Sequence, residues 1–164
     1  AQGGSLRVYV CHKNSRKINK KKIDKQIIKE VKRGLFKVKL YKNYLQRMQK
    51  EMKKFQNFIR KYNSKYIFGF GAPAKLTTFS HFFRIKRNQI NSIVDDNKLK
   101  QKRFSPGQKF PIISFAKLQK LKCEIIIIFA WNFSVSIIMK LKKVYKGKNI
   151  KVVIPFPKLK VINL

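Results

Sequence analysis

The longest apolar run in the sequence is Ile125–Trp131, a seven-residue segment that begins with four consecutive isoleucines. A transmembrane helix needs about 20 apolar residues, so this run is too short to span a bilayer. β-Branched residues are enriched in strands, and a strand without polar alternation is covered on both faces. Residues 124–130 are therefore predicted to form a buried strand, which requires helices on both sides of its sheet.

The rest of the C-terminal hundred residues alternates between strand-like and helical patterns. Further strands are predicted at residues 65–70, 89–94, 111–113 and 151–154, and helices at residues 73–83, 115–122 and 132–145. In the last helix, Asn132 is the predicted N-cap, and Gly147 is the residue that ends it. Strands separated by helices of this length favour a doubly wound parallel sheet. We therefore predict an α/β domain over residues 63–164, with a Rossmann-like parallel sheet flanked by helices.

Residues 1–62 are predicted to form a basic N-terminal part that precedes this domain. Alternating residue types predict a short strand at Ser5–Val10, and the polar, basic residues after it predict an exposed linker. A helix is expected at residues 25–32, ended by Gly34. A longer amphipathic helix is expected at residues 38–61, because apolar residues recur there at steps of three and four and basic residues occupy the opposite face. The domain is thus preceded by a basic helical arm.

The charge balance of the chain is extreme. It carries 41 lysines and arginines but only 6 aspartates and glutamates, and its formal net charge is +35. Fewer than one cation in six can have a carboxylate partner in the same chain, and the other cations repel one another in a compact state. Residues 52–94 contain no acid at all. The charge therefore predicts an anionic partner, for which nucleic acid and an anionic membrane surface are the candidates.

Structured RNA is the partner that we expect, because it is contacted through phosphates, shape and 2′-hydroxyls and needs no base-reading motif. The sequence contains no RRM, KH or zinc-finger motif. An anionic membrane is the alternative, supported by the amphipathic helix at residues 38–61, but such a helix does not explain basic residues spread over the whole chain. The predicted phosphate contacts are Lys20, Lys21, Lys22, Lys42, Arg47, Lys53, Lys54, Arg60, Arg84, Arg87, Lys98, Lys100, Lys102 and Arg103.

Residue usage favours an organellar origin and a non-enzymatic role. Lysine outnumbers arginine 33 to 8, and the abundant residues Lys, Ile, Asn and Phe have A/T-rich codons. This bias suggests an organelle genome and hence a mitochondrial location. Two cysteines (Cys11 and Cys123) and two histidines (His12 and His81) are too few for a disulfide framework, a self-contained zinc site or a His-rich catalytic centre. No metal, cofactor or catalytic residue is predicted.

The predicted strand at residues 65–70 runs into the sequence Gly69-Phe-Gly-Ala-Pro-Ala-Lys75. A glycine turn between a strand and a helix is the phosphate-binding geometry of dinucleotide folds, because the backbone can approach a ligand and the helix N-terminus offers free N–H groups. The third glycine of the usual motif is replaced by Ala74. Taken alone, the turn therefore also fits a purely structural role.

Four segments together resemble, in the same order, the C-terminal domain of the sugar C-methyltransferases. They are Gly3–Tyr9, Gly69–Lys75, Val94–Asn97 with Pro106, Gly107, Pro111 and Ile112, and Ala130–Asn132 with Ile154–Pro157. The resemblance implies a Rossmann-like domain that helps to bind a nucleotide-sugar. It places Gly69, Gly71, Ala72 and Lys75 at the phosphates, and Asp95 or Asp96 near a ribose hydroxyl. A turn and capping role for the two aspartates is the alternative.

The family's enzymes carry a zinc-binding region and a methyl-donor-binding domain before this domain, whereas the present chain begins almost at its first segment. We therefore expect neither zinc nor S-adenosylmethionine to bind, and we expect the nucleotide site to be vestigial. The predicted function is that of a non-catalytic, rRNA-binding structural component of a mitochondrial ribosome, in contact with neighbouring ribosomal proteins. The alternative is a nucleotide-sugar-binding half of a split sugar C-methyltransferase, in which a second chain completes a sheet next to Ser5–Val10.

Overall fold

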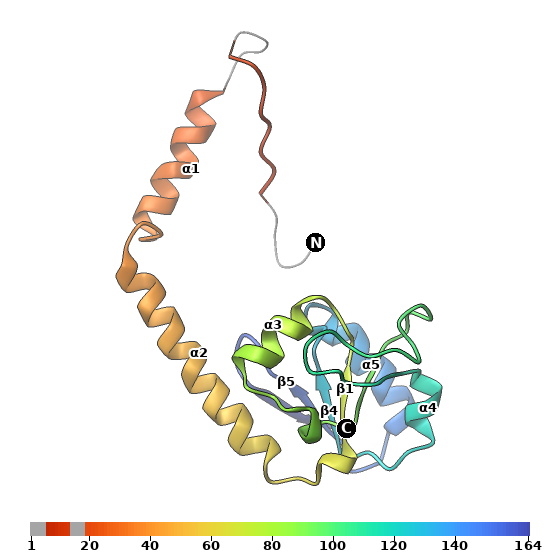
Figure 1. The fold of residues 1–164 in the computed structure, drawn as a ribbon. Coiled ribbons are helices and arrows are strands. Elements are labelled where there is room, and N and C mark those ends of the chain that lie inside the picture. Colours follow the sequence, from red (N-terminus) through yellow and green to blue (C-terminus); the bar gives the residue numbers. More distant parts are fainter. Residues whose placement is uncertain (1–5, 14–18) are drawn as a thin grey trace. The chain divides into compact units, whose positions relative to one another are not determined.

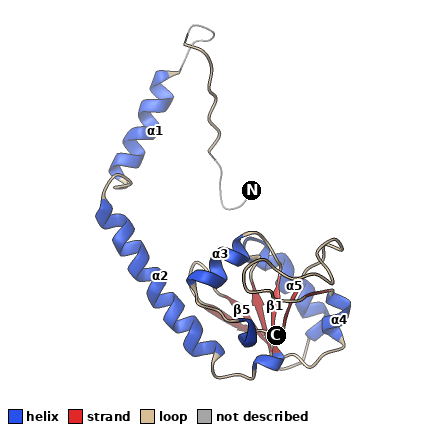
Figure 2. Ribbon diagram, viewed as in Figure 1, coloured by secondary structure: helices blue, strands red, loops and turns tan. Residues whose placement is uncertain are grey.

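The computed structural model of the chain describes residues 6–13 and 19–164 (Figures 1 and 2). The chain divides into two compact units, residues 1–48 and residues 49–164. The first unit contains α1 (Lys20–Lys32) and the first half of α2 (Val38–Ile59). The second unit contains the end of α2 and the whole sheet, whereas the domain boundary predicted from the sequence lies after residue 62.

The first helix, α1, has well-defined ends. The side chain of Asn19 accepts a hydrogen bond from the Lys22 N–H at 3.1 Å, which caps the helix N-terminus. Gly34 follows the helix with a φ of +73°, a backbone conformation that favours glycine, so the predicted stop is confirmed. The predicted start at residue 25 is wrong, because the cap at Asn19 lets the helix begin five residues earlier, at Lys20.

The predicted strand near the N-terminus is wrong for residues 6–10, which are exposed and have no regular structure. Ser5, the first residue of that predicted strand, lies outside the described residues. A strand needs a neighbour for its backbone N–H and C=O groups, and the strands of the described sheet pair with one another instead. Alternating residue types alone were therefore not sufficient to form a strand here.

The second unit is built around one six-stranded sheet with the order β3-β2-β1-β4-β5-β6. Its strands are β1 (Ile67–Phe70), β2 (Ser92–Val94), β3 (Ile112–Ile113), β4 (Ile125–Ile128), β5 (Lys151–Ile154) and β6 (Lys160–Asn163). The first five strands run parallel, and β6 pairs antiparallel with β5. This is the strand order of the Rossmann fold. The predicted fold class is therefore confirmed, with the correction that the sheet is mixed.

The antiparallel strand β6 was not predicted. Pro155 and Pro157 follow β5 closely, and proline cannot donate a ladder hydrogen bond. They lie in the connection that turns the chain back, and Val153 then pairs with Val161.

Helices cover both faces of the sheet, as the apolar strand predicts (Figure 1). On one face, α4 (Phe115–Gln119) and α5 (Ser134–Tyr145) pack on a cluster that includes Phe70 and Ile126. On the other face, Phe79 of α3 (Lys75–Phe82) contacts the rings of Phe129 and of Phe55 in α2. Between these layers the four isoleucines of β4 are completely buried. The central strand is thus confirmed.

The predicted cap of α5 is wrong. Residues Trp131–Phe133 form a 3₁₀ turn, and α5 begins only at Ser134. The cap position is Phe133, which makes no side-chain cap hydrogen bond. Asn132 is displaced from the cap because the 3₁₀ turn inserts between the end of β4 and the first residue of the helix. Gly147, with a φ of +78°, follows the helix as predicted.

Candidate functional site

The strand order changes direction at β1. The chain passes from β1 to β2 and β3 on one side and then returns to β4 on the other side. In open α/β sheets, ligands bind outside the carboxyl ends of the strands at such a switch point. The turn after β1 contains Gly71 and Ala72, and the loop after β2 contains Asp95 and Asp96. The fold thus brings these four predicted nucleotide-binding residues to one edge of the sheet.

Gly71 is required by the backbone of this turn. Its φ is +85°, and its N–H donates to the Val94 carbonyl at 2.7 Å. A Cβ atom at this position would lie 2.6 Å from the Cβ of Ala130, which follows β4. The turn after β1 and the turn after β4 therefore touch, and glycine is what allows this approach.

Gly69 has a different role from the one that the resemblance implies. It lies inside β1, and a Cβ there would meet Ile93 Cδ1 at 2.3 Å and Phe129 Cε2 at 2.6 Å. The space beside Gly69 is thus filled by core side chains. Its lack of a side chain serves close packing inside the sheet layers and leaves no room for a phosphate at that point.

Asp95 links the two loops at the switch point. One carboxylate oxygen, Oδ2, accepts the Ala72 N–H at 2.7 Å and lies 3.4 Å from Lys100 Nζ. Lys100 also donates to the Ala72 carbonyl at 3.0 Å. The other oxygen, Oδ1, accepts the Asn97 N–H at 2.9 Å. The side chain of Asp95 is only 12% exposed, so this network holds the two loops together from a sheltered position.

Asp96 faces away from this network toward α5. Both of its carboxylate oxygens lie 2.8 Å from Lys140 Nζ. The same ammonium lies 4.5 Å from the centroid of the Phe115 ring, a cation–π distance. Asp96 therefore joins the loop after β2 to α5.

Lys75, the first residue of α3, is covered by an indole ring. Its Nζ lies 4.1 Å from the centroid of Trp131, and burial lowers the pKa of the Lys75 ammonium. Trp131 also contacts the Phe156 ring, with the centroids 5.0 Å apart. Among the described residues, Trp131 thus holds the cation that the resemblance assigns to the phosphates.

Sequence reasoning missed two members of this region, Trp131 and Lys140. Trp131 ends the apolar run that predicts core, and Lys140 is one of 33 lysines, so the local sequence marked neither residue as part of a site. The resemblance of Ala130–Asn132 to a family segment was the signal that could have identified Trp131.

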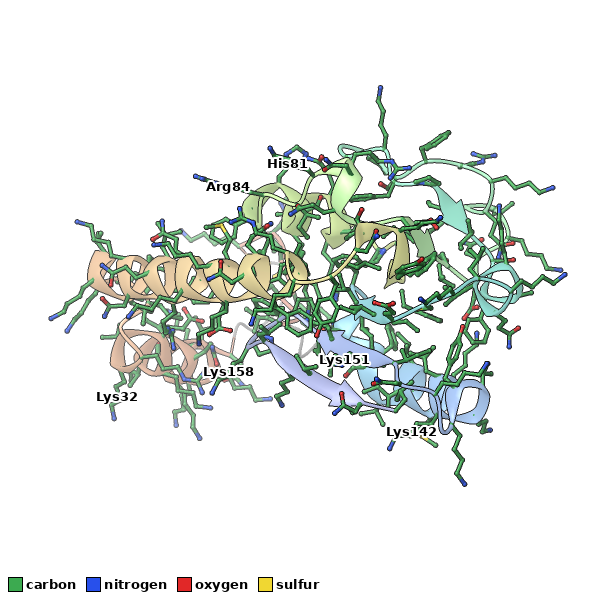
Figure 3. All side chains as sticks on the ribbon, turned by 90° about the horizontal axis from the view of Figure 1, so that it is seen from below. Lys32, His81, Arg84, Lys142, Lys151 and Lys158 are labelled. Atoms are coloured by element: carbon green, nitrogen blue, oxygen red, sulfur yellow. The ribbon has the colours of Figure 1, made fainter. Side chains whose placement is uncertain are left out.

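The fourteen predicted phosphate contacts come from both units. All of them are exposed except Lys100, which is half-buried in the Asp95 network. Three others are partly engaged within the chain. Arg87 donates to the Ile90 carbonyl at 3.1 Å, Lys54 lies 2.8 Å from Glu51, and the Arg47 guanidinium lies 5.8 Å from the centroid of the Tyr44 ring. In Figure 3 the long basic side chains, with Lys32, Arg84 and Lys142 among those labelled, extend away from the ribbon.

Few of the cations have a carboxylate partner. Within the described ranges, ion pairs shorter than 4.0 Å involve four lysines, namely Lys54, Lys100, Lys122 and Lys140. The remaining lysines and arginines of those ranges have no carboxylate of a described residue within that distance. Most of the positive charge is therefore not neutralised by the described part of the chain.

Residues 6–13 and 19–164 hold neither a candidate metal centre nor a candidate membrane span. In this part of the chain, no three His, Cys, Asp or Glu side chains lie close enough to share a metal ion. None of its helices has the length and apolar character needed to span a membrane.

Comparison with known proteins identifies the family of the chain. The model of the C-methyltransferase C-terminal domain matches residues 1–157. No curated protein matches the chain. Among solved structures, the chain is similar to UDP-D-quinovosamine 4-dehydrogenase from Vibrio fischeri, with 17% identity, coverage of 62% of this chain and 95% of that chain, and a TM-score of 0.44. Because the family model spans nearly the whole sequence, the chain belongs to the family of C-methyltransferase C-terminal domains.

Proposed function

We propose that this chain is a non-catalytic, RNA-binding structural component of a mitochondrial ribosome, built on a methyltransferase-derived fold. The observation that carries the proposal is the large number of exposed cations that have no carboxylate partner among the described residues. Phosphates can neutralise such charge with a favourable release of counterions. Ribosomal RNA and neighbouring ribosomal proteins are the proposed partners.

The loop between β2 and β3 presents cations on a fixed backbone. The Lys102 N–H donates to the Ile112 carbonyl at 2.9 Å, and the Ile112 N–H donates to the Arg103 carbonyl at 2.8 Å. The side chains of Lys98, Lys102 and Arg103 are nevertheless exposed. A backbone that is already ordered loses little conformational entropy when its side chains bind phosphates.

The polar groups at the switch point support the non-catalytic part of the proposal. Asp95 and Lys100 bind each other and Ala72, and Lys75 lies on Trp131. These groups stabilise the connections between loops by contacts within the chain. Their arrangement is accounted for by a structural role, without a bound nucleotide.

The mitochondrial part of the proposal depends on residue usage. Arginine is the better residue for bidentate phosphate contacts, yet lysine outnumbers arginine 33 to 8. A coding bias toward A/T-rich codons acting on a cation-rich protein explains this preference. An organelle genome is a source of such a bias.

Sedimentation of native mitochondrial extract, with the chain followed by mass spectrometry, tests the proposal. We expect the chain to migrate with a ribosomal particle and to leave that position after ribonuclease treatment. Migration as a small complex that ribonuclease does not change would contradict RNA binding.

Paired variants test the RNA contacts themselves. Replacing Lys102 and Arg103 by glutamine removes two cations from the ordered loop. We expect weaker binding to ribosomal RNA and a slope of log affinity against log salt that is shallower by about 2. Lys122→Gln is the control, because Lys122 lies 3.5 Å from Glu124 and over the Tyr66 ring. An equal loss from the control would show that the loop has no special part in binding.

A second candidate is a nucleotide-sugar-binding half of a split sugar C-methyltransferase. The match of the family model and the retained turn at Gly71 favour it. Its catalytic half would be a second chain, which could pair with the segment Ser5–Val10, of which residues 6–10 are exposed. Calorimetric titration of the full chain with uridine and thymidine diphosphates tests this candidate. Binding that Asp95→Asn weakens would support this candidate, and a titration without binding would exclude it.

A further inference from the structure

The first helix, α1, is amphipathic but buries none of its side chains. Ile23, Ile27 and Val31 follow one another at steps of four residues, so they form one stripe along the helix. Their exposed fractions are 49%, 46% and 55%. A helix of 13 residues has marginal stability in water, and most helices in proteins are stabilised by packing of their apolar face. The stripe is therefore the part of α1 that needs a covering surface.

Charges are distributed unevenly around this helix. At about 100° per residue, the stripe spans about 80° of the circumference, and Asp24 and Glu30 lie about 20° beyond its two edges. These are the two acids in the first 48 residues of the chain. Five of the six lysines of α1 span about 100° of the opposite side, whereas Lys20, the first residue of the helix, lies on the side of the stripe. The five are Lys21, Lys22, Lys25, Lys29 and Lys32.

The apolar stripe of Ile23, Ile27 and Val31 is called the α1 stripe. Together with the two acids at its edges, it suits neither RNA nor an anionic membrane. The carboxylates of Asp24 and Glu30 repel the phosphates of RNA and of anionic lipids alike. Contact with a phosphate backbone also gives apolar side chains no favourable free energy. In an interfacial helix, the residues that border the apolar face lie at the level of the lipid headgroups, and in α1 those positions hold the acids Asp24 and Glu30. A protein surface is therefore the partner that fits the α1 stripe.

A second copy of this chain is a poor occupant. Each copy carries a formal charge of +35, so two copies repel each other. In an antiparallel pair of α1 helices centred on Ile27, Asp24 of one copy would also face Glu30 of the other. Like charges placed directly opposite each other are unfavourable.

The geometry points to a different protein as the occupant, one with an apolar groove bordered by lysines. Such a groove takes the α1 stripe by the helix-in-groove mode, with anchors at i, i+4 and i+8, and its lysines pair with Asp24 and Glu30. The opposite, lysine-rich side of α1 remains free for phosphates. The helix then connects a protein and an RNA through two different faces, and the protein contact does not depend on the proposed RNA contact.

Carbodiimide cross-linking of the native assembly tests this inference, because the reagent joins a carboxylate to an amine that touches it. We expect Asp24 or Glu30 to be amide-linked to lysines of one other protein, next to exposed apolar residues, and the link to survive ribonuclease. Glu51 is the internal control. Its carboxylate is held by the Leu159 N–H and by Lys54, so any amide link from Glu51 should stay within this chain. Links to this chain alone, or no links from either acid, would overturn the inference.

Two matched variants then test the stripe in the full chain. Ile27→Gln changes the middle of the α1 stripe, and Lys29→Gln changes the opposite side of the same helix. Neither residue is buried, so we expect the second unit to stay folded in both variants. We expect Ile27→Gln to weaken binding of the cross-linked protein about tenfold, as loss of a central anchor does, and Lys29→Gln to change it less than about twofold. Equal effects of the two substitutions would contradict a stripe-specific contact.

Discussion

Gln56, near the end of α2, connects this helix to the segment after α3, and its replacement by leucine gives a sharp test of that connection. Its Nε2 donates to the Phe83 carbonyl at 2.7 Å and to the Arg84 carbonyl at 3.2 Å. Its Oε1 accepts from Gln89 Nε2 at 3.0 Å. Gln56 is only 8% exposed, so water cannot readily replace these bonds.

Leucine is similar in size to glutamine but offers no polar atoms. An unsatisfied buried carbonyl costs about 1–3 kcal/mol, and the loss of a further hydrogen bond costs about 1 kcal/mol. We therefore expect Gln56→Leu to lower the free energy of unfolding by about 2–4 kcal/mol. Urea denaturation of the full chain should show a lower midpoint with an unchanged m-value.

Gln49→Leu is the matched control, because Gln49 lies on the same helix and is exposed. Its expected effect is within about 0.5 kcal/mol. A Gln56→Leu variant as stable as this control would refute the reasoning, since it would show that the three hydrogen bonds add nothing to the attachment of α2.

Three other substitutions test different parts of the second unit. Glu51→Gln should destabilise the chain at neutral pH, because the Leu159 N–H and Lys54 lower the pKa of Glu51. The difference in unfolding free energy between variant and parent, measured from urea midpoints, should shrink as the pH falls below 4.5 and through the lowered pKa. A constant difference down to acidic pH would contradict this. Gly71→Ala should cost about 2 kcal/mol or more in the same assay, from positive φ and contact with Ala130, whereas Gly147→Ala, which meets no atom within 4 Å, should cost about 1 kcal/mol. Equal costs would exclude the contact with Ala130 as a cause. Tyr145→Phe should leave the melting temperature unchanged or raise it, because the buried Tyr145 hydroxyl has no hydrogen-bond partner in the described structure. A lower melting temperature would mean that the hydroxyl is satisfied.

The features that the sequence alone determined are those set by local pattern. Four consecutive isoleucines can be covered on both faces only in a central strand, and the order of strands and helices around them leads to a Rossmann-like sheet. The three- and four-residue spacing of apolar side chains likewise determines α2. The family followed from short segments in a fixed order, and the model match over residues 1–157 confirmed it.

Tertiary structure decided the features that depend on which segments meet. β6 exists because the edge of β5 accepts an antiparallel partner, and residues 6–10 lack a strand because no described edge pairs with them. The glycines at 69 and 71 look alike in sequence, but Gly69 makes room for Ile93 and Phe129, whereas Gly71 provides a positive φ beside Ala130.

The same division applies to the charged residues. The sequence determines that cations far outnumber acids, since charge is a matter of composition. Only the fold determines which cations are used internally, because an ion pair needs two groups within a few ångströms of each other. Asp95 and Lys100 are held at the Ala72 backbone, and Asp96 is held by Lys140, 44 residues away in the chain. Contacts at such separations follow from how the loops after the parallel strands converge at one edge of the sheet.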